Sequence, residues 1–118
     1  MTREEAIQLT AERWRAFLRS DPRKIVIGQE TCVLCAYDRE VGQGDCKRCP
    51  KFDRTGKANC EGSPHAAAYY AIQFWAENPL SPLAQALAST AILAEIAFIE
   101  DLSETASMCQ FKQLDIKD

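Results

Sequence analysis

The sequence predicts one mainly α-helical domain over residues 1–118, with three helices packed around a loop-rich, zinc-stapled insert. Apolar residues recur at helical spacing on both sides of a central segment, whereas all five glycines and five of the six cysteines lie inside it, at residues 28–62. No linker or repeat divides the chain. Its 118 residues are 47% hydrophobic and 26% charged, which suits one modest core and excludes a wholly disordered chain.

The first helix is expected at about residues 3–19, with an apolar side of residues that recur at helical spacing: Ile7, Thr10/Ala11, Trp14 and Phe17/Leu18. Thr2 and Glu5 have the spacing of a capping box, in which each side chain satisfies a free amide of the other residue. Ser20-Asp21-Pro22 ends this helix. The β-branched run Ile25–Ile27, closed by a glycine, predicts a short strand, and the fold is expected to hold at most one or two such strands.

The second and third helices are expected at about residues 64–77 and 82–102. Each follows a Ser-Pro pair, in which serine caps the helix and proline suits its first position. The second helix is expected to place Ala67, Tyr70 and Phe74 on one apolar side, widened by Ala68, Ile72 and Trp75. The third has two apolar rows, which predicts packing on both sides: Leu83, Leu87, Ala91, Ala94 and Phe98, and Ile92, Ile96 and Ile99.

The insert, residues 28–62, has too few large apolar residues to fold alone, and its cysteine spacing predicts a metal staple like that of zinc ribbons and knuckles. Two Cys-x2-Cys pairs and one further cysteine offer five thiolates for the four positions around one Zn²⁺. The candidates are Cys32, Cys35, Cys46, Cys49 and Cys60. The first four are the simplest set, although Cys60 can replace Cys46, and His65 is a weaker candidate. An iron–sulfur cluster also takes four thiolates and is the alternative.

The expected compartment is the cytoplasm, where thiols stay reduced and paired cysteines bind metal more often than each other. Met1 to Glu5 carry charges of both signs, without the apolar stretch of a secretory signal. The longest uncharged stretch, residues 78–94, is too weakly apolar to predict a membrane span. Cys109 lies apart near the C-terminus and is expected to be a small, partly buried hydrophobe.

The sequence does not predict an enzyme. A zinc ion with four thiolates has no open position for substrate, and the single histidine, His65, cannot supply a catalytic zinc site or a Ser-His-Asp triad. The chain also lacks a Gly-rich phosphate loop.

A basic run on the second Cys-x2-Cys pair supports an alternative function, a zinc-dependent nucleic-acid-binding module with Phe52 stacking on a base. Its members are Lys47, Arg48, Lys51, Arg54 and Lys57, opposed by Asp53 alone. The interpretation we favour is that these cations offset the negative charge of a four-thiolate zinc site. Residues 77–118 hold seven acids against two lysines, and this end reads as a solvated acidic face.

Cys32-Val-Leu-Cys35, Cys46-Lys-Arg-Cys49-Pro50 and Cys60-Glu-Gly-Ser-Pro64 resemble small cysteine-rich proteins encoded by phages and prophages. In that group a Cys-x-Leu-Cys knuckle precedes a Cys-x2-Cys-Pro knuckle and a Cys-x-Gly-(Ser/Thr)-Pro step into a helix. Residues 94–102 resemble the closing helix of the group. The resemblance implies a zinc site and a phage or prophage setting, hence a bacterial host cell, but no biochemical activity.

We therefore expect a non-catalytic accessory protein that binds a host or phage protein, with inhibition of a host process or defence system as its effect. The predicted contact surface is the acidic, doubly apolar last helix, which is also the expected site of any homo-oligomer.

Overall fold

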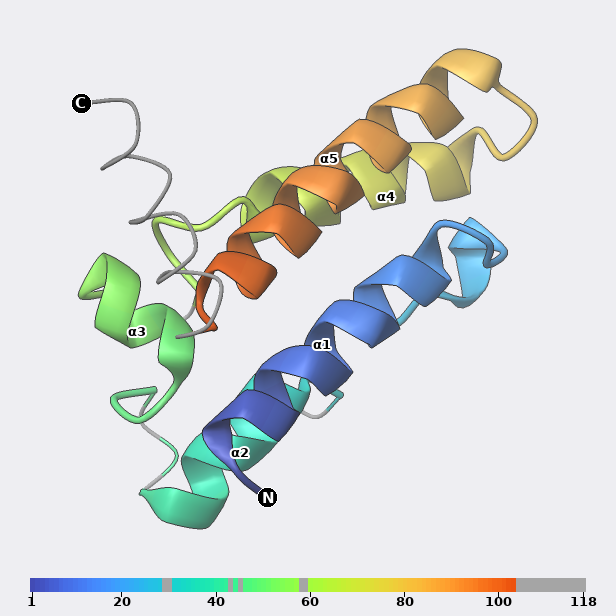
Figure 1. Cartoon of the computed structure of the whole chain (residues 1–118). Coiled ribbons are helices and arrows are strands. Elements are labelled where there is room, and N and C mark those ends of the chain that lie inside the picture. The colour runs from blue at the N-terminus through green and yellow to red at the C-terminus, as the bar shows by residue number, and fades with distance from the viewer. Residues whose placement is uncertain (29–30, 43, 45, 58–59, 104–118) are drawn as a thin grey trace, which may run out of the picture.

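In the computed structural model the described residues, 1–28, 31–42, 44, 46–57 and 60–103, form a helical molecule (Figure 1). The elements are α1 (Arg3–Phe17), the 3-10 helix η1 (Pro22–Lys24), α2 (Val33–Val41), α3 (Pro50–Thr55), α4 (His65–Glu77) and α5 (Pro82–Asp101). The predicted mainly helical class is thus confirmed, and each of the three predicted helices lies within two residues of its expected bounds.

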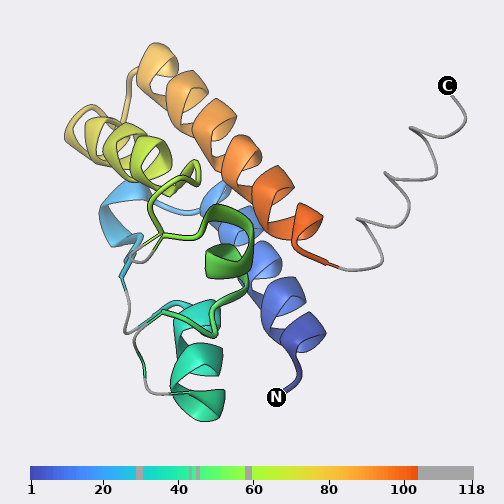
Figure 2. The ribbon, with the colours of Figure 1, turned by 90° about the vertical axis from the view of Figure 1, so that its left-hand side faces the viewer.

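Helices α1, α4 and α5, which we call the frame, pack side by side (Figures 1 and 2). Helices α4 and α5 form an antiparallel hairpin, and α1 runs antiparallel to α5, since the Arg3 guanidinium donates to the Leu102 carbonyl at 3.0 Å. Local signals set the helix starts. The Thr2–Glu5 capping box is present, and the Ser81 side chain accepts a hydrogen bond from the Ala84 amide.

The core lies between these helices and is aromatic and aliphatic. Its buried residues come mainly from the predicted apolar side of α1 and from the isoleucine row of α5. They include Ile7, Ala11, Trp14, Phe17, Ala68, Ile72, Ile92, Ile96 and Ile99. A smaller cluster of Trp75, Ala84 and Ala88 closes the far end of the hairpin. The periodicity of α1 and the second row of α5 therefore predicted the core correctly.

The exposed sides of α4 and α5 differ from the sequence expectation. Tyr70 and Phe74 are exposed on α4, because Ala68, Ile72 and Trp75 face the core instead. On α5 the row that begins with Leu83 and Leu87 is divided: these two leucines are exposed, whereas Ala91 and Phe98 are partly buried and pack against the core. Helix α5 contacts both α4 and α1. Small Ala84 and Ala88 let α4 approach α5 closely, which leaves the leucines outside.

The predicted strand is absent from the described residues, which contain no strand. Ile25 has extended backbone angles, and both Ile25 and Ile27 pack against the core while Val26 is exposed. The segment thus has the alternation of a strand, but the part of the chain that the structure describes offers no second strand to complete a sheet.

The insert is less loop-rich than predicted, because it contains α2 and α3. Cys32 and Cys49 stand at the N-cap positions of these two helices, and Pro50 occupies the first turn of α3. Helix α2 packs against α1, and α3 lies near the ends of α1 and α5, where the Arg54 side chain bonds the Asp101 carbonyl at 2.9 Å. The insert therefore covers the end of the frame where α1 begins and α5 ends (Figure 2).

Among the described helices α5, Pro82–Asp101, is long and apolar enough to cross a membrane by length and composition alone. Core helices of soluble proteins pass the same test. Here its isoleucine row is buried in the core and Glu95, in its middle, pairs with Lys51. This helix therefore gives no ground for a membrane assignment.

Candidate metal centre

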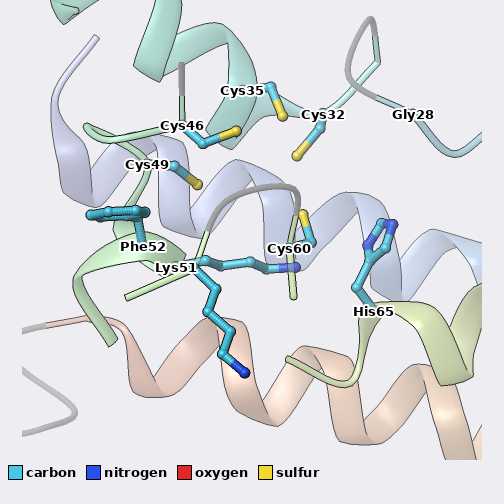
Figure 3. A pocket seen from close by; sticks show the side chains of 10 residues that line it. Gly28, Cys32, Cys35, Cys46, Cys49, Lys51, Phe52, Cys60 and His65 are labelled. Atoms are coloured by element: carbon cyan, nitrogen blue, oxygen red, sulfur yellow. The ribbon is translucent and has the colours of Figure 1, made fainter. Parts of the chain in front are cut away.

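Five cysteines from three separate stretches of the insert line one cavity of about 140 Å³ (Figure 3). Cys32 and Cys35 come from the start of α2, Cys46 and Cys49 from the turn before α3, and Cys60 from the segment before α4. Their sulfur atoms point toward the shared space in Figure 3. All of the predicted metal-ligating cysteines are thus brought together, and none of the five is in a disulfide.

The first pair sits where a helix begins, and its two thiols interact directly. The pKa of Cys32 is lowered, first because its sulfur shares a hydrogen bond with Cys35 and further because backbone amides of Cys35 and Leu34 favour the thiolate. The pKa of Cys35 is raised, because Cys35 holds the shared proton. The hydrogen bond between the two sulfur atoms thus favours the thiolate at Cys32 and the thiol at Cys35, and a metal ion that bound both would displace the remaining proton.

Two of the five cysteines have a backbone conformation that side chains other than glycine rarely adopt. Cys46 has φ 71° and Cys60 has φ 63°, both in the left-handed region. This conformation costs about 1–2 kcal/mol per residue for an L-amino acid. Such strain persists where the surrounding structure requires the side chain at one place, and here that place is the cysteine-lined cavity.

Burial disfavours the thiolate forms of two further cysteines, Cys49 and Cys60. Burial raises the pKa of Cys49 to about 11, and burial also raises the pKa of Cys60. Binding of a cation would have to displace the protons of these thiols, so metal affinity should increase with pH.

A buried ion pair lies beside the cavity and ties α3 to α5. The Lys51 ammonium lies 2.8 Å from the Glu95 carboxylate, and both residues are almost fully buried, at 3% and 0% exposure. Burial alone would lower the pKa of Lys51, but Glu95 and then Cys60 raise it above its usual value. Burial alone would raise the pKa of Glu95, but His65 and Lys51 lower it. Both groups are therefore charged in the folded chain.

His65 lines the cavity but faces two neighbours of its own. Its Nδ1 lies 3.3 Å from Glu95 Oε2, and its ring meets Trp14 edge-on at a centroid distance of 5.8 Å. Only Nε2 therefore remains for a metal. Metal binding by His65 stays a prediction, secondary to that by the cysteines.

The donor set fits zinc in its chemistry, since four thiolates form a closed structural site for this ion. The five cysteine side chains are spaced more widely than the ligands of a closed zinc site. Within the described residues, no three His, Cys, Asp or Glu side chains already stand close enough to hold a metal ion. The cysteines surround a common space, and they would have to move inward to meet at one ion.

One member of the basic run is buried and another is paired within the chain. Lys51 is buried against Glu95, and Arg54 forms a salt bridge with Asp101, so neither side chain is available to a phosphate without breaking an internal contact. Lys47, Arg48 and Lys57 are exposed, and Lys57 lines the cavity. Phe52 also lines the cavity and is half-buried, so its ring is only partly accessible to a base.

The acidic face of α5 is likewise engaged within the molecule. Glu95 pairs with Lys51, Glu100 with Arg15 and Asp101 with Arg54. The remaining predicted acids beyond residue 103, and Cys109, lie outside the described residues.

Two residues of the site were missed by sequence reasoning. Asp38 on α2 accepts hydrogen bonds from the backbone amides of Cys46 and Arg48, and Glu95 anchors Lys51. The available signal for Asp38 was its position three residues after Cys35, on the same side of a helix. Glu95 stands in an apolar row beside Ile92, Ile96 and Ile99, where a lone acid predicts a buried partner.

No protein-family model matches the chain, and no curated protein or solved structure is significantly similar to it.

Proposed function

We propose that this chain is a non-catalytic, zinc-stabilised module that acts by binding another protein. The observation that carries the proposal is the gathering of five cysteines around one cavity of about 140 Å³ beside a helical frame. A zinc ion with four thiolates has no vacant position for water or substrate, so it would organise the fold and do no hydrolysis. Cys32, Cys35, Cys46, Cys49 and Cys60 would supply the four ligands, with one thiol to spare.

The partner surface in this proposal is the hairpin of α4 and α5. Among the large apolar side chains that it exposes are five that we call the hairpin patch: Tyr70, Phe74, Leu80, Leu83 and Leu87. No charged residue occurs from residue 78 to residue 94. Leu80 is 95% exposed at the tip of the hairpin. Contiguous exposed apolar surface is typical of protein-binding sites, and the proposal takes these side chains to form such a surface.

The acidic residues of α5 do not support this contact, because Glu95, Glu100 and Asp101 are engaged in salt bridges within the chain. The proposal therefore rests on the apolar hairpin patch, and it differs in this respect from the acidic surface expected from the sequence. An uncharged, apolar helix of the partner is the chemistry that such a patch would accept.

The resemblance of residues 32–64 to phage and prophage proteins extends the proposal to biology. We propose a bacterial cytoplasmic setting, a host or phage protein as the partner, and inhibition of a host process or defence system as the result. Nucleic-acid binding through the basic run is the competing function, and it is disfavoured by the internal pairing of Lys51 and Arg54.

The test is capture of partners from a bacterial lysate by reduced protein whose metal content has first been measured. We expect one zinc per chain and no absorbance at about 400 nm, the region that would reveal an iron–sulfur cluster. Leu87→Asp should abolish capture, because it places a charge in the hairpin patch. The matched control is Leu9→Asp, because Leu9 on α1 is as exposed as Leu87, at 47% and 48%.

Equal loss of capture in Leu87→Asp and Leu9→Asp would contradict the assignment of the hairpin patch. Capture that disappears after nuclease treatment, with binding to DNA or RNA at about 50 mM salt that weakens steeply as salt rises, would favour the nucleic-acid function. A metal-free wild-type protein that does not take up zinc under reducing conditions would remove the zinc part of the proposal.

A further inference from the structure

The turn that carries Cys46 is held by a carboxylate from another element. Asp38, on α2, accepts a hydrogen bond at Oδ2 from the Cys46 amide at 2.9 Å, and one at Oδ1 from the Arg48 amide at 2.7 Å. Asp38 itself is only 2% exposed. Each carboxylate oxygen thus has a backbone donor, and both donors belong to the second Cys-x2-Cys turn.

Asp38 also faces the cysteines. Together with Cys35, Cys46 and Cys49 it lines a small cavity of about 20 Å³. Asp38 lies one helical turn after Cys35, so the side of α2 that presents a thiol to the site also presents this carboxylate to the turn that carries the next two thiols. It therefore connects the first cysteine pair to the second through protein atoms.

The chain between the two pairs is shaped for this contact. A side-chain carbon at Gly42 would stand 2.7 Å from Arg48 Cγ, and Gly44 has φ +75°. The glycines allow the segment to fold back tightly onto the end of α2. The left-handed conformation of Cys46 is then fixed by the hydrogen bond that its amide donates to Asp38.

We propose that Asp38 is a positioning residue of the metal centre, which holds Cys46 at the cavity before any metal binds. The role of Asp38 in metal binding rests on the proposed function, whereas its hydrogen bonds to the Cys46 and Arg48 amides do not depend on that function. Carboxylates that orient ligand-bearing groups without touching the metal are a recurrent part of metal sites.

The test compares Asp38→Asn with Glu40→Gln. The asparagine side chain would keep the size of the aspartate but present an NH2 group to one of the two amides, so one hydrogen bond is lost. Glu40 is an exposed acid on the same helix, and its substitution removes the same charge. We expect Asp38→Asn to weaken zinc binding by about 10- to 100-fold in competition with a chromogenic chelator. Glu40→Gln should stay within about twofold of wild type.

A second measurement does not need metal. In the reduced, metal-free protein we expect iodoacetamide to alkylate Cys46 several times faster in Asp38→Asn than in wild type, as read by peptide mass spectrometry. The rate at Cys32, which lies at the start of α2 and outside the turn that Asp38 holds, serves as the internal control. A general loss of folding would accelerate all cysteines together, whereas loss of positioning accelerates Cys46 selectively.

The outcomes separate this inference from the proposed function. If wild type takes up no zinc but Asp38→Asn still exposes Cys46 selectively, the metal function fails and the positioning role of Asp38 stands. If Asp38→Asn matches wild type in zinc affinity and in Cys46 alkylation, the positioning role is overturned while the metal function is untouched. Equal acceleration at all five thiols would also overturn it, because Asp38 would then be a general stability residue.

Discussion

The frame of α1, α4 and α5 and the cysteine-rich insert at residues 28–62 are held by different kinds of contact. The frame buries large apolar residues such as Ile7, Trp14 and Ile92 in a continuous core. In the described part of the insert the buried residues are few and mostly bear sulfur, charge or a ring: Leu34, Asp38, Cys49, Pro50 and Lys51. The insert therefore depends on specific polar contacts and, in our proposal, on a metal ion.

The comparison shows that non-directional apolar contacts stabilise the frame, whereas directional polar contacts stabilise the insert. Apolar burial holds the frame and tolerates modest changes of shape. The insert offers little apolar area, so the turns that carry its thiols are held by particular hydrogen bonds and ion pairs. Substitutions in the two regions should consequently fail in different ways.

The largest expected effect is at the junction between the two regions, the Lys51–Glu95 pair. Lys51→Met should destabilise the fold by about 3–5 kcal/mol, because it leaves the Glu95 carboxylate buried without its cation. Urea denaturation followed by circular dichroism measures this change. The double variant Lys51→Met, Glu95→Met should recover most of the loss, since it removes the stranded charge. A single variant as stable as wild type would show that the pair does not join the regions.

The next effect is confined to the frame. Ile92→Ala should cost about 2–5 kcal/mol, because Ile92 is fully buried in the α1–α5 core and its truncation leaves a cavity. Leu83→Ala on the same helix is the control, expected within about 0.5 kcal/mol because Leu83 is exposed. Both changes in the free energy of unfolding are obtained from the midpoints of urea denaturation, with the slope of the transition unchanged. Comparable losses in the two variants would mean that the exposed row of α5 is packed in solution, as in a homo-oligomer.

The smallest expected effects come from substitutions at the N-cap of a helix in each region, α5 in the frame and α2 in the insert. Ser81→Ala should cost about 1 kcal/mol, because Ser81 caps α5 through the Ala84 amide. Cys32→Ser, at the N-cap of α2, should change the stability of the metal-free protein by no more than about 0.5 kcal/mol, since serine is itself a favoured cap.

The same Cys32→Ser variant should bind zinc more weakly, which the chelator competition described above measures. A Cys32→Ser protein that keeps full zinc affinity would exclude Cys32 from the ligand set. Comparison of Ser81→Ala with Cys32→Ser thus distinguishes an N-cap residue that stabilises its helix from an N-cap residue that binds the metal ion.

The three frame helices could be predicted because their signals are local. The Thr2–Glu5 capping box and the Pro82 start act over three or four residues, and both occur in the structure as expected. The same proline rule applied to Pro50 indicates the start of α3, which the reading of the insert as loops overlooked. Applied to Pro22, expected only to end the first helix, it indicates the start of η1.

The candidate metal ligands could also be predicted, since cysteine spacing is a property of the sequence. All five thiols meet at one cavity. Which of them bind zinc was left open by spacing and stays a matter for the chelator and alkylation measurements. The residues that support them were not predicted, because Asp38 and Glu95 act on partners that are distant along the chain or belong to another element.

By itself the sequence determined the helical class, where the frame helices begin and end, and which thiols gather, because caps, prolines and short spacings act locally. Only the tertiary structure decided which sides of α4 and α5 are buried and which charges pair. Lys51 and Glu95 are 44 residues apart, and nothing near either residue indicates the other. Burial and ion pairing depend on what the fold brings alongside, so two cations of the basic run, Lys51 and Arg54, form internal ion pairs with two acids of α5 that are distant in the sequence.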